Sequence, residues 1–247
     1  MDQAVILSTA RTPIGKAYRG AFNDTDAPTL ASFSIKASID KAGLDPSEIE
    51  DVILGAAVQQ GSQGYNIGRL SAVSSGLPIH VPGMSVDRQC ASGLMAIAIG
   101  AKQIACKEMD VVVAGGVESI SLVQNEFSNK YRSQDKLLMK NKPDLYMSMI
   151  DTAEVVAKRY NISRDKQDEY ALQSQKRTAN AQNKGFFNKE IISASLMPFW
   201  FPSVLTTISL SLMAAIMSLI VFVAAKSLLI TDFFNSEFNC SLIKRLC

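Results

Sequence analysis

The residue best suited to chemistry in this chain is Cys90, which stands where a strand is expected to give way to a helix. Residues 81–86 mix β-forming residues with Pro82 and Gly83, and residues 91–107 carry apolar side chains at helical spacing. A cysteine at the start of a helix meets unpaired backbone N–H groups and the positive end of the helix dipole, which favour a thiolate. The three residues after it are small, so a bulky substrate could approach the sulfur. Cys90 is therefore a candidate nucleophile, with a buried, unreactive cysteine as the alternative.

The elements that must position this cysteine alternate between strands and helices. Strands are expected at residues 5–8, 51–58, 81–86 and 110–114, and helices at residues 29–42, 67–75 and 91–107. This alternation predicts an α/β fold with helices covering a mainly parallel sheet. Ligands of such sheets bind at the carboxyl ends of the strands, and Cys90 and the Gly115-Gly116 pair both follow a strand.

The second part of the chain has a different character. Polar, loop-like sequence is expected at residues 125–143, and helices at residues 152–159 and 164–183. Ser163 is placed to cap the second of these helices and Gly185 to end it. Its many charged side chains are expected to form a solvated face.

Several ordered segments carry a family resemblance. They are residues 4–15 (AVILSTARTPIG), 85–96 (SVDRQCASGLMA), 114–119 (AGGVES), 146–154 (YMSMIDTAE) and 163–168 (SRDKQD). Over residues 4–192 the chain resembles the thiolases, enzymes that cleave or form β-ketoacyl-CoA thioesters. Asp87 departs from the pattern, because many thiolases carry Asn or Ser there. Ketoacyl synthases share the fold and a cysteine nucleophile, but the AGGVES and Met149 segments match thiolases.

The resemblance implies an incomplete thiolase-like layered fold. Residues 1–118 would form the N-terminal α/β domain, and residues 119–192 the loop domain that covers the CoA and acyl pocket. Met149 matches a family methionine that lines the acyl pocket, and a flexible core methionine is the alternative reading. Homo-oligomer formation is expected.

The implied activity is acyl transfer between CoA thioesters through an acyl-cysteine at Cys90, as in an acetyl-CoA C-acetyltransferase or a 3-ketoacyl-CoA thiolase. Acyl-CoA and CoA would be the substrates, without a metal or other cofactor. In the family, a Gly-His-Pro histidine and a second cysteine in a Cys-x-Gly-Gly-Gly turn complete the site, and neither motif occurs in this sequence. The chain alone is therefore expected to be inactive. The alternative is a non-catalytic thiolase-fold remnant that binds acyl-CoA or a partner subunit.

The remaining titratable residues and the overall composition argue against nucleic-acid binding, a metal site and a second catalytic group. The single histidine, His80, is expected in the loop before the Cys90 strand rather than beside the thiol. Lys and Arg total 25 against 23 acidic residues, so no charge excess favours nucleic acid. The four cysteines lack metal-binding spacing, and Cys106 is expected in the core. The first residues resemble neither a signal nor a transit peptide, which makes the cytoplasm the default location.

Residues 193–247 differ from the rest. No charged residue lies between Glu190 and Lys226, and the apolar run 203–225 is long enough to cross a bilayer. One explanation is a tail anchor that holds the protein at a membrane. The other is sequence from a shifted frame or an unspliced transcript.

Overall fold

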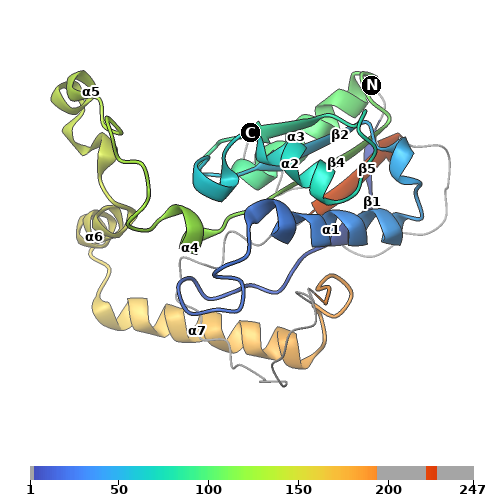
Figure 1. Cartoon of the computed structure of the whole chain (residues 1–247). Helices are drawn as coiled ribbons and strands as arrows, with labels where there is room; N and C mark the ends of the chain where they lie inside the picture. Colours follow the sequence, from blue (N-terminus) through green and yellow to red (C-terminus); the bar gives the residue numbers. More distant parts are fainter. Residues whose placement is uncertain (1–2, 194–220, 227–247) are drawn as a thin grey trace.

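A mixed β-sheet forms the centre of the protein. The computed structural model describes residues 3–193 and 221–226 (Figure 1). In these residues, five strands form one sheet in the order β1-β5-β4-β2-β3. The strands are β1 (Ala4–Ala10), β2 (Asp51–Gly55), β3 (Gly83–Val86), β4 (Val111–Gly116) and β5 (Val221–Lys226).

Strand direction divides the sheet into two parts. β2 runs parallel to both of its neighbours, with Val52 opposite Gly83 of β3 and Val113 of β4. β5 runs antiparallel to both of its neighbours, with Val223 opposite Ser8 of β1 and Val113 of β4. The parallel part confirms the predicted α/β architecture, and its strands all end at the edge that carries Cys90.

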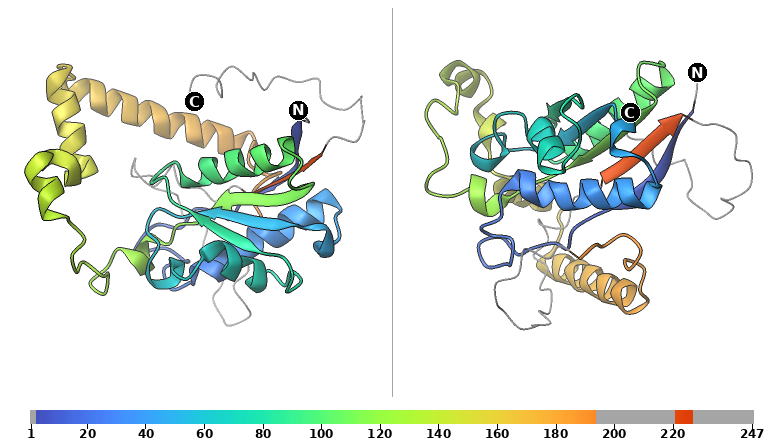
Figure 2. Two further views of the ribbon diagram at one scale, coloured as in Figure 1. Left: turned by 90° about the horizontal axis from the view of Figure 1, so that it is seen from above. Right: turned by 45° about the vertical axis from the view of Figure 1, so that its right-hand side comes forward.

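Helices cover both faces of the sheet. Helices α1 (Ala27–Ala42) and α2 (Ile67–Ser74) pack on one face, and α3 (Ser92–Ala105) packs on the other (Figure 2, left). Side chains alternate along β2, so Val52 and Leu54 join the core under α1, whereas Ile53 packs against Ala96 of α3. Both faces of β2 are buried, which explains its continuous apolar sequence.

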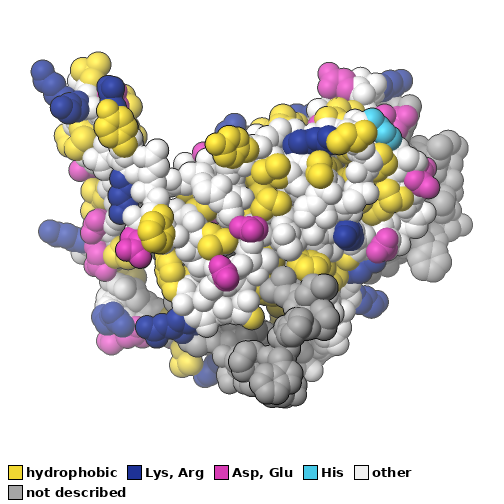
Figure 3. All heavy atoms as spheres, in the orientation of Figure 1, with side chains coloured by type: hydrophobic (Ala, Val, Ile, Leu, Met, Phe, Trp, Pro, Cys, Tyr) yellow, Lys and Arg dark blue, Asp and Glu magenta, His cyan; other side chains and the backbone are white. Residues whose placement is uncertain are grey.

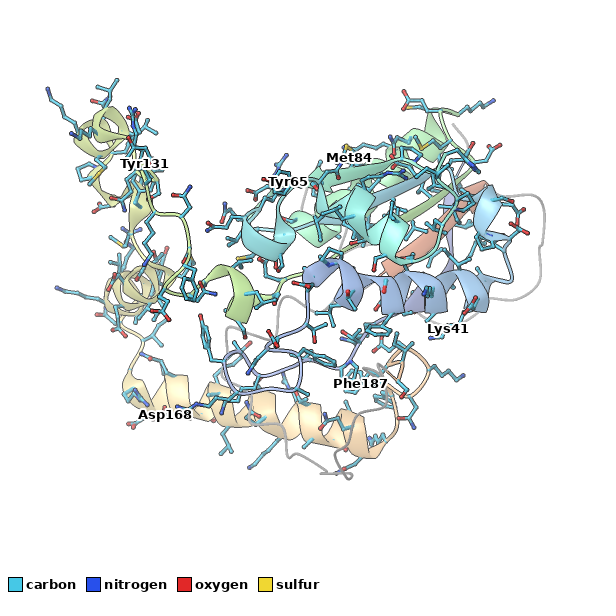
Figure 4. All side chains as sticks on the ribbon, in the orientation of Figure 1. Lys41, Tyr65, Met84, Tyr131, Asp168 and Phe187 are labelled. Carbon is cyan, nitrogen blue, oxygen red and sulfur yellow. The ribbon has the colours of Figure 1, made fainter. Side chains whose placement is uncertain are left out.

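The second half of the chain forms α4 (Ile120–Val123), α5 (Lys136–Asn141), α6 (Met149–Arg159) and α7 (Arg164–Asn183). Of these helices, α5 and α6 project away from the sheet (Figure 1). Three short 3-10 turns complete the described elements: η1 (Pro46–Glu48), η2 (Gly61–Gln63) and η3 (Pro143–Tyr146). Ser163 caps α7 as predicted, and none of the α7 residues is buried. In Figure 4, Tyr131 on the projecting part lies far from Tyr65 on the sheet domain.

The chain returns from α7 to the sheet domain through a polar clamp. Arg11 forms an ion pair with Glu190, and its guanidinium stacks 5.3 Å from the ring centroid of Phe187. Lys41 of α1 donates from Nζ to the carbonyls of Thr9 at 3.2 Å and Lys189 at 3.0 Å. Figure 4 shows Lys41 and Phe187 on the two sides of this junction. The clamp joins the end of the projecting part to β1 and α1.

Three local predictions were wrong. The segment predicted as loop at residues 125–143 contains α5, whose start is capped by the Asp135 carboxylate. The strand predicted for residues 51–58 ends at Gly55, because the chain turns there toward η2. Cys106 is exposed rather than in the core, since α3 ends one residue earlier and Ile104 fills the buried position.

Part of the predicted membrane span, residues 203–225, lies in a strand of the sheet. Residues 203–220 lie outside the described residues, and residues 221–225 belong to β5. Among the residues that the structure describes, no helix is both long and apolar enough to cross a bilayer. The domain boundaries at residues 118 and 192, and the origin of the 193–247 tail, stay predictions.

Candidate active site

Cys90 lies just beyond the carboxyl end of β3, in a tight turn that leads into α3. It is exposed, and the first helical residue, Ser92, follows two positions later. Gln89, directly before it, has a φ of 49°, a left-handed conformation that is uncommon for a residue with a side chain. The turn therefore presents Cys90 at the N-terminus of α3, as the sequence predicts.

Two side chains hold this turn in its left-handed form. The Ser92 hydroxyl is buried, accepts a hydrogen bond from the Arg88 N–H at 2.9 Å and donates to the Gln89 carbonyl at 2.6 Å. The Asp87 carboxylate accepts from the Gln89 N–H at 2.7 Å. These bonds offset the local strain at Gln89, which is typically of the order of ~1–3 kcal/mol. Asp87, the departure from the family pattern, thus has a defined role in the loop.

Glycines allow the start of α3 to lie directly on the ends of β2 and β4. A Cβ atom at Gly55 would stand 2.2 Å from the Ser92 carbonyl carbon, so only glycine fits there. A Cβ at Gly116 would stand 3.1 Å from the Gly93 Cα and 3.1 Å from the Gly55 carbonyl oxygen. The start of α3, two residues after Cys90, consequently rests on two parallel strands.

A carboxylate and an amide join the loops at the same edge of the sheet. Glu118 accepts from the Ala57 N–H at 2.8 Å and from Nε2 of Gln63 at 2.6 Å. The same Gln63 amide donates to the Val58 carbonyl at 2.8 Å, and its oxygen accepts from the Ser119 N–H. Gln63 is 1% exposed, so these contacts form a buried, satisfied network.

His80 lies away from Cys90, as predicted. It is exposed in the turn before β3, whereas Cys90 follows the opposite end of that strand. At about 3.3 Å per residue, the four residues of β3 alone separate the two positions by roughly 10 Å. His80 is therefore poorly placed to act on the Cys90 thiol.

Met149 occupies the first turn of α6 and is 57% exposed. Ser148 caps this helix by accepting from the Asp151 N–H at 3.1 Å. Figure 1 and the left panel of Figure 2 both show α6 apart from α3, so the structure does not bring Met149 to the Cys90 turn. The assignment of Met149 to an acyl pocket stays a prediction, as does the catalytic role of Cys90.

Sequence reasoning missed Gln63 and Gly55. Gln63 sits in a Gln/Gly/Ser-rich stretch that has the composition of an ordinary loop, and nothing local marks its side chain as buried. Gly55 could have been identified from the sequence, because a glycine at the end of an apolar strand often marks a position where another backbone approaches closely. Glu118 belongs to the AGGVES segment that carries the family resemblance, but the sequence does not indicate which residues it contacts.

Fold and site together define a class of protein: an α/β domain that presents a cysteine at a helix start, beyond the carboxyl ends of parallel strands. The family described as "Thiolase, N-terminal domain" matches residues 4–198. This match covers most of the sequence, and the chain belongs to the thiolase family.

Named relatives agree with this assignment. The chain is 38% identical over 192 residues to a 3-ketoacyl-CoA thiolase of Bacillus subtilis, covering 78% of this chain and 49% of that protein. It is 36% identical over 202 residues to an acetyl-CoA acetyltransferase of Cupriavidus necator, covering 78% and 51%. The chain thus spans about half the length of the curated relatives it matches.

A solved structure confirms the fold. The crystal structure of the Bacillus anthracis acetyl-CoA acetyltransferase matches with a TM-score of 0.70 and 26% identity, covering 92% of this chain and 66% of that one. The structural match covers more of the chain than the sequence matches do.

Proposed function

We propose that Cys90 accepts an acyl group from an acyl-CoA thioester, the first half of a thiolase-type acyl transfer. The observation that carries this proposal is the exposed thiol at the N-terminus of α3, held by the turn at Gln89. The names of the relatives, 3-ketoacyl-CoA thiolase and acetyl-CoA acetyltransferase, support a substrate of this class.

The proposed step is an exchange of thioesters. The Cys90 sulfur attacks the carbonyl carbon of the acyl-CoA, and the carbonyl oxygen becomes an oxyanion. The Ser92 N–H already donates to the Gln89 carbonyl at 3.0 Å. The Gly93 and Leu94 N–H groups, also in the first turn of α3, have no carbonyl partner within the helix and can stabilise that charge. The carbon–sulfur bond to CoA then breaks, CoA leaves as a thiol with the proton that Cys90 lost, and an acyl-cysteine remains.

The second half of the reaction needs a base for the incoming acetyl-CoA or CoA. His80 lies at the other end of β3, so the described residues place no histidine at Cys90. General acid–base help typically contributes about 10²–10⁴-fold. We therefore expect acylation of Cys90 by this chain but negligible thiolysis of acetoacetyl-CoA.

Acetyl-CoA tests the first step. Incubation of the full chain with acetyl-CoA should acetylate the peptide that contains Cys90, detected by mass spectrometry, and Cys90→Ser should remove the modification. Cys106→Ser is the matched control, because Cys106 lies at the other end of the same helix and is also exposed. Equal acetylation of both cysteines, or none at Cys90, would contradict the proposal.

The position of His80 also favours a second function, a non-catalytic domain that binds acyl-CoA or a partner subunit. In that case, acetyl-CoA binds to the Cys90→Ser variant with unchanged affinity, and no acyl-enzyme forms. Homo-oligomer formation, a cytoplasmic location and membrane attachment through residues 203–225 stay predictions of the sequence.

A further inference from the structure

The half-buried carboxylate of Glu118 is not used in the acyl transfer described above, yet it lies at the same edge of the sheet as Cys90. Both of its oxygens accept hydrogen bonds, from the Ala57 N–H and from the Gln63 amide. Gln63 in turn bonds the backbone on both sides, at Val58 and Ser119. One pair of side chains therefore fixes the loop after β2 to the turn after β4.

The fixed loop is continuous with the surface on which the Cys90 turn rests. The Gly55 carbonyl accepts from the Val117 N–H at 2.9 Å, and the Ala56 N–H donates to the Val86 carbonyl at 3.0 Å. Val86 is the last residue of β3, directly before the turn. The Gly55 Cα lies against the Ser92 backbone with no room for a side chain. Displacement of residues 55–57 would therefore displace both ends of the Cys90 turn.

The same loop reaches the projecting part of the molecule. Gln60 lies three residues before the buried Gln63. Its Oε1 accepts a hydrogen bond from the Asn129 N–H at 2.8 Å. The turn η2 also lies against α4, where a Cβ at Gly61 would stand 3.3 Å from the Leu122 carbonyl oxygen. Residues 56–64 thus lie between the nucleophile and the start of the segment that carries Met149.

We propose that Glu118 and Gln63 are positioning residues for Cys90. They hold residues 55–57 in place, and this backbone supports the turn that presents the thiol to its electrophile. The inference rests on the proposed function only in taking Cys90 as the acyl acceptor.

Alkylation by iodoacetamide tests the positioning without acyl-CoA. In the full chain, Glu118→Gln leaves one acceptor for two donors, and its amide nitrogen faces an N–H group. We expect the rate of Cys90 alkylation, divided by that of Cys106 in the same sample, to fall about 10-fold. A misplacement of ~1 Å between reacting groups can lower a rate by up to about 10²-fold, so a 10-fold fall corresponds to a small movement of the thiol. Glu126→Gln changes an exposed glutamate eight residues further along the chain, so it is the matched control and should leave the ratio unchanged.

An exchange of the two side chains distinguishes positioning from a general loss of stability. In Gln63→Glu/Glu118→Gln the side chains can again bond to each other and to the Ala57 and Ser119 N–H groups, and only the bond to Val58 is lost. The double variant should recover most of the alkylation ratio that either single variant loses. An unchanged ratio in Glu118→Gln, or no recovery in the exchanged pair, would overturn the proposal.

Amide hydrogen exchange of the unmodified chain gives a second measurement that does not depend on a folded variant. The Ala57 and Ser119 amides should exchange as slowly as amides of β2, and exchange at the rate of an exposed loop would overturn the proposal. If Cys90 resists acetylation by acetyl-CoA while the alkylation ratio responds as expected, the proposed function fails and the positioning role stands.

Discussion

At the scale of single residues, Asp51 shows how a buried carboxyl links stability to pH. It begins β2 at the edge of the sheet opposite Cys90, is 6% exposed, and accepts from the Val52 N–H at 2.7 Å. Burial raises the pKa of Asp51 above its ordinary value of 3.8, and the Val52 hydrogen bond opposes this more weakly. The folded state therefore holds this proton more tightly than the unfolded chain does. The contribution to stability is present below pH 3.8 and is lost as pH rises through the folded-state pKa.

Asp51→Asn keeps an acceptor for Val52 and removes the buried charge. Its free energy of unfolding should exceed that of the parent at pH 7, and the difference should shrink as pH falls toward 3.8. Urea unfolding of both chains over a pH series measures this difference. Asp45→Asn is the comparison, and its effect on the free energy of unfolding at pH 7 should have the opposite sign. Hydrogen bonds from the Ser47 hydroxyl and N–H lower the pKa of Asp45, so the charged carboxylate stabilises the fold there. A pH-independent difference at Asp51 would contradict the burial argument.

At the scale of elements, the contact between β2 and α3 depends on a missing side chain. Gly55→Ala places a methyl group 2.2 Å from the Ser92 carbonyl carbon, so strand and helix must separate. Overpacking of this kind typically costs about 1–3 kcal/mol, and the Cys90 turn should move with the helix. We expect a lower thermal midpoint and slower alkylation of Cys90.

Gly64→Ala provides the matched control for this contact. Gly64 has an extended, negative φ, and its nearest neighbour would lie 3.4 Å from the new methyl group, an ordinary contact. This substitution should leave the midpoint unchanged or raise it slightly, because alanine lowers the entropy of the unfolded chain. Equal midpoints for the two variants would show that β2 and α3 are not tightly packed.

At the scale of the whole molecule, β5 joins β1 to the rest of the sheet. Within residues 3–193 and 221–226, β1 pairs only with β5, and β5 pairs with β4 on its other side. A chain that ends at Ile192 loses both ladders, each of whose bonds contributes about 1 kcal/mol. Since a domain is stable by only about 5–15 kcal/mol in total, this truncation should abolish cooperative unfolding, whereas a chain that ends at Lys226 should retain it. Calorimetry of both chains checks this, and identical transitions would show that β5 does not stabilise the sheet.

The surface of the projecting part is also a property of the whole molecule. Figure 3 shows hydrophobic and basic side chains together on the part that carries α5. Phe127 and Tyr131 are among its most exposed large hydrophobic residues. Residues 125–143 were predicted from the sequence to be polar and loop-like, whereas this part of the surface also exposes large apolar side chains.

Local patterns in the sequence were sufficient for much of the fold and for one part of the site. The spacing of apolar residues placed α1, α2, α3 and the parallel strands, because each of these elements buries one face along a regular period. The change from strand to helix at Cys90 placed the thiol at the start of α3 for the same reason.

Only the tertiary structure decided which distant residues meet at the edge of the sheet that carries that thiol. Gln63 and Glu118 are 55 positions apart and come together because β2 and β4 are parallel neighbours whose ends share one edge of the sheet. Cys106 proved exposed because its environment depends on where α3 ends. Residues 221–226 proved to be a strand, although the apolar residues 221–225 were predicted to belong to a membrane span. The sequence does not reveal this strand locally, because backbone pairing with β1 and β4 depends on partners more than 100 positions away. Periodicity reports which face of an element is buried, but burial partners are chosen by the packing of the whole chain.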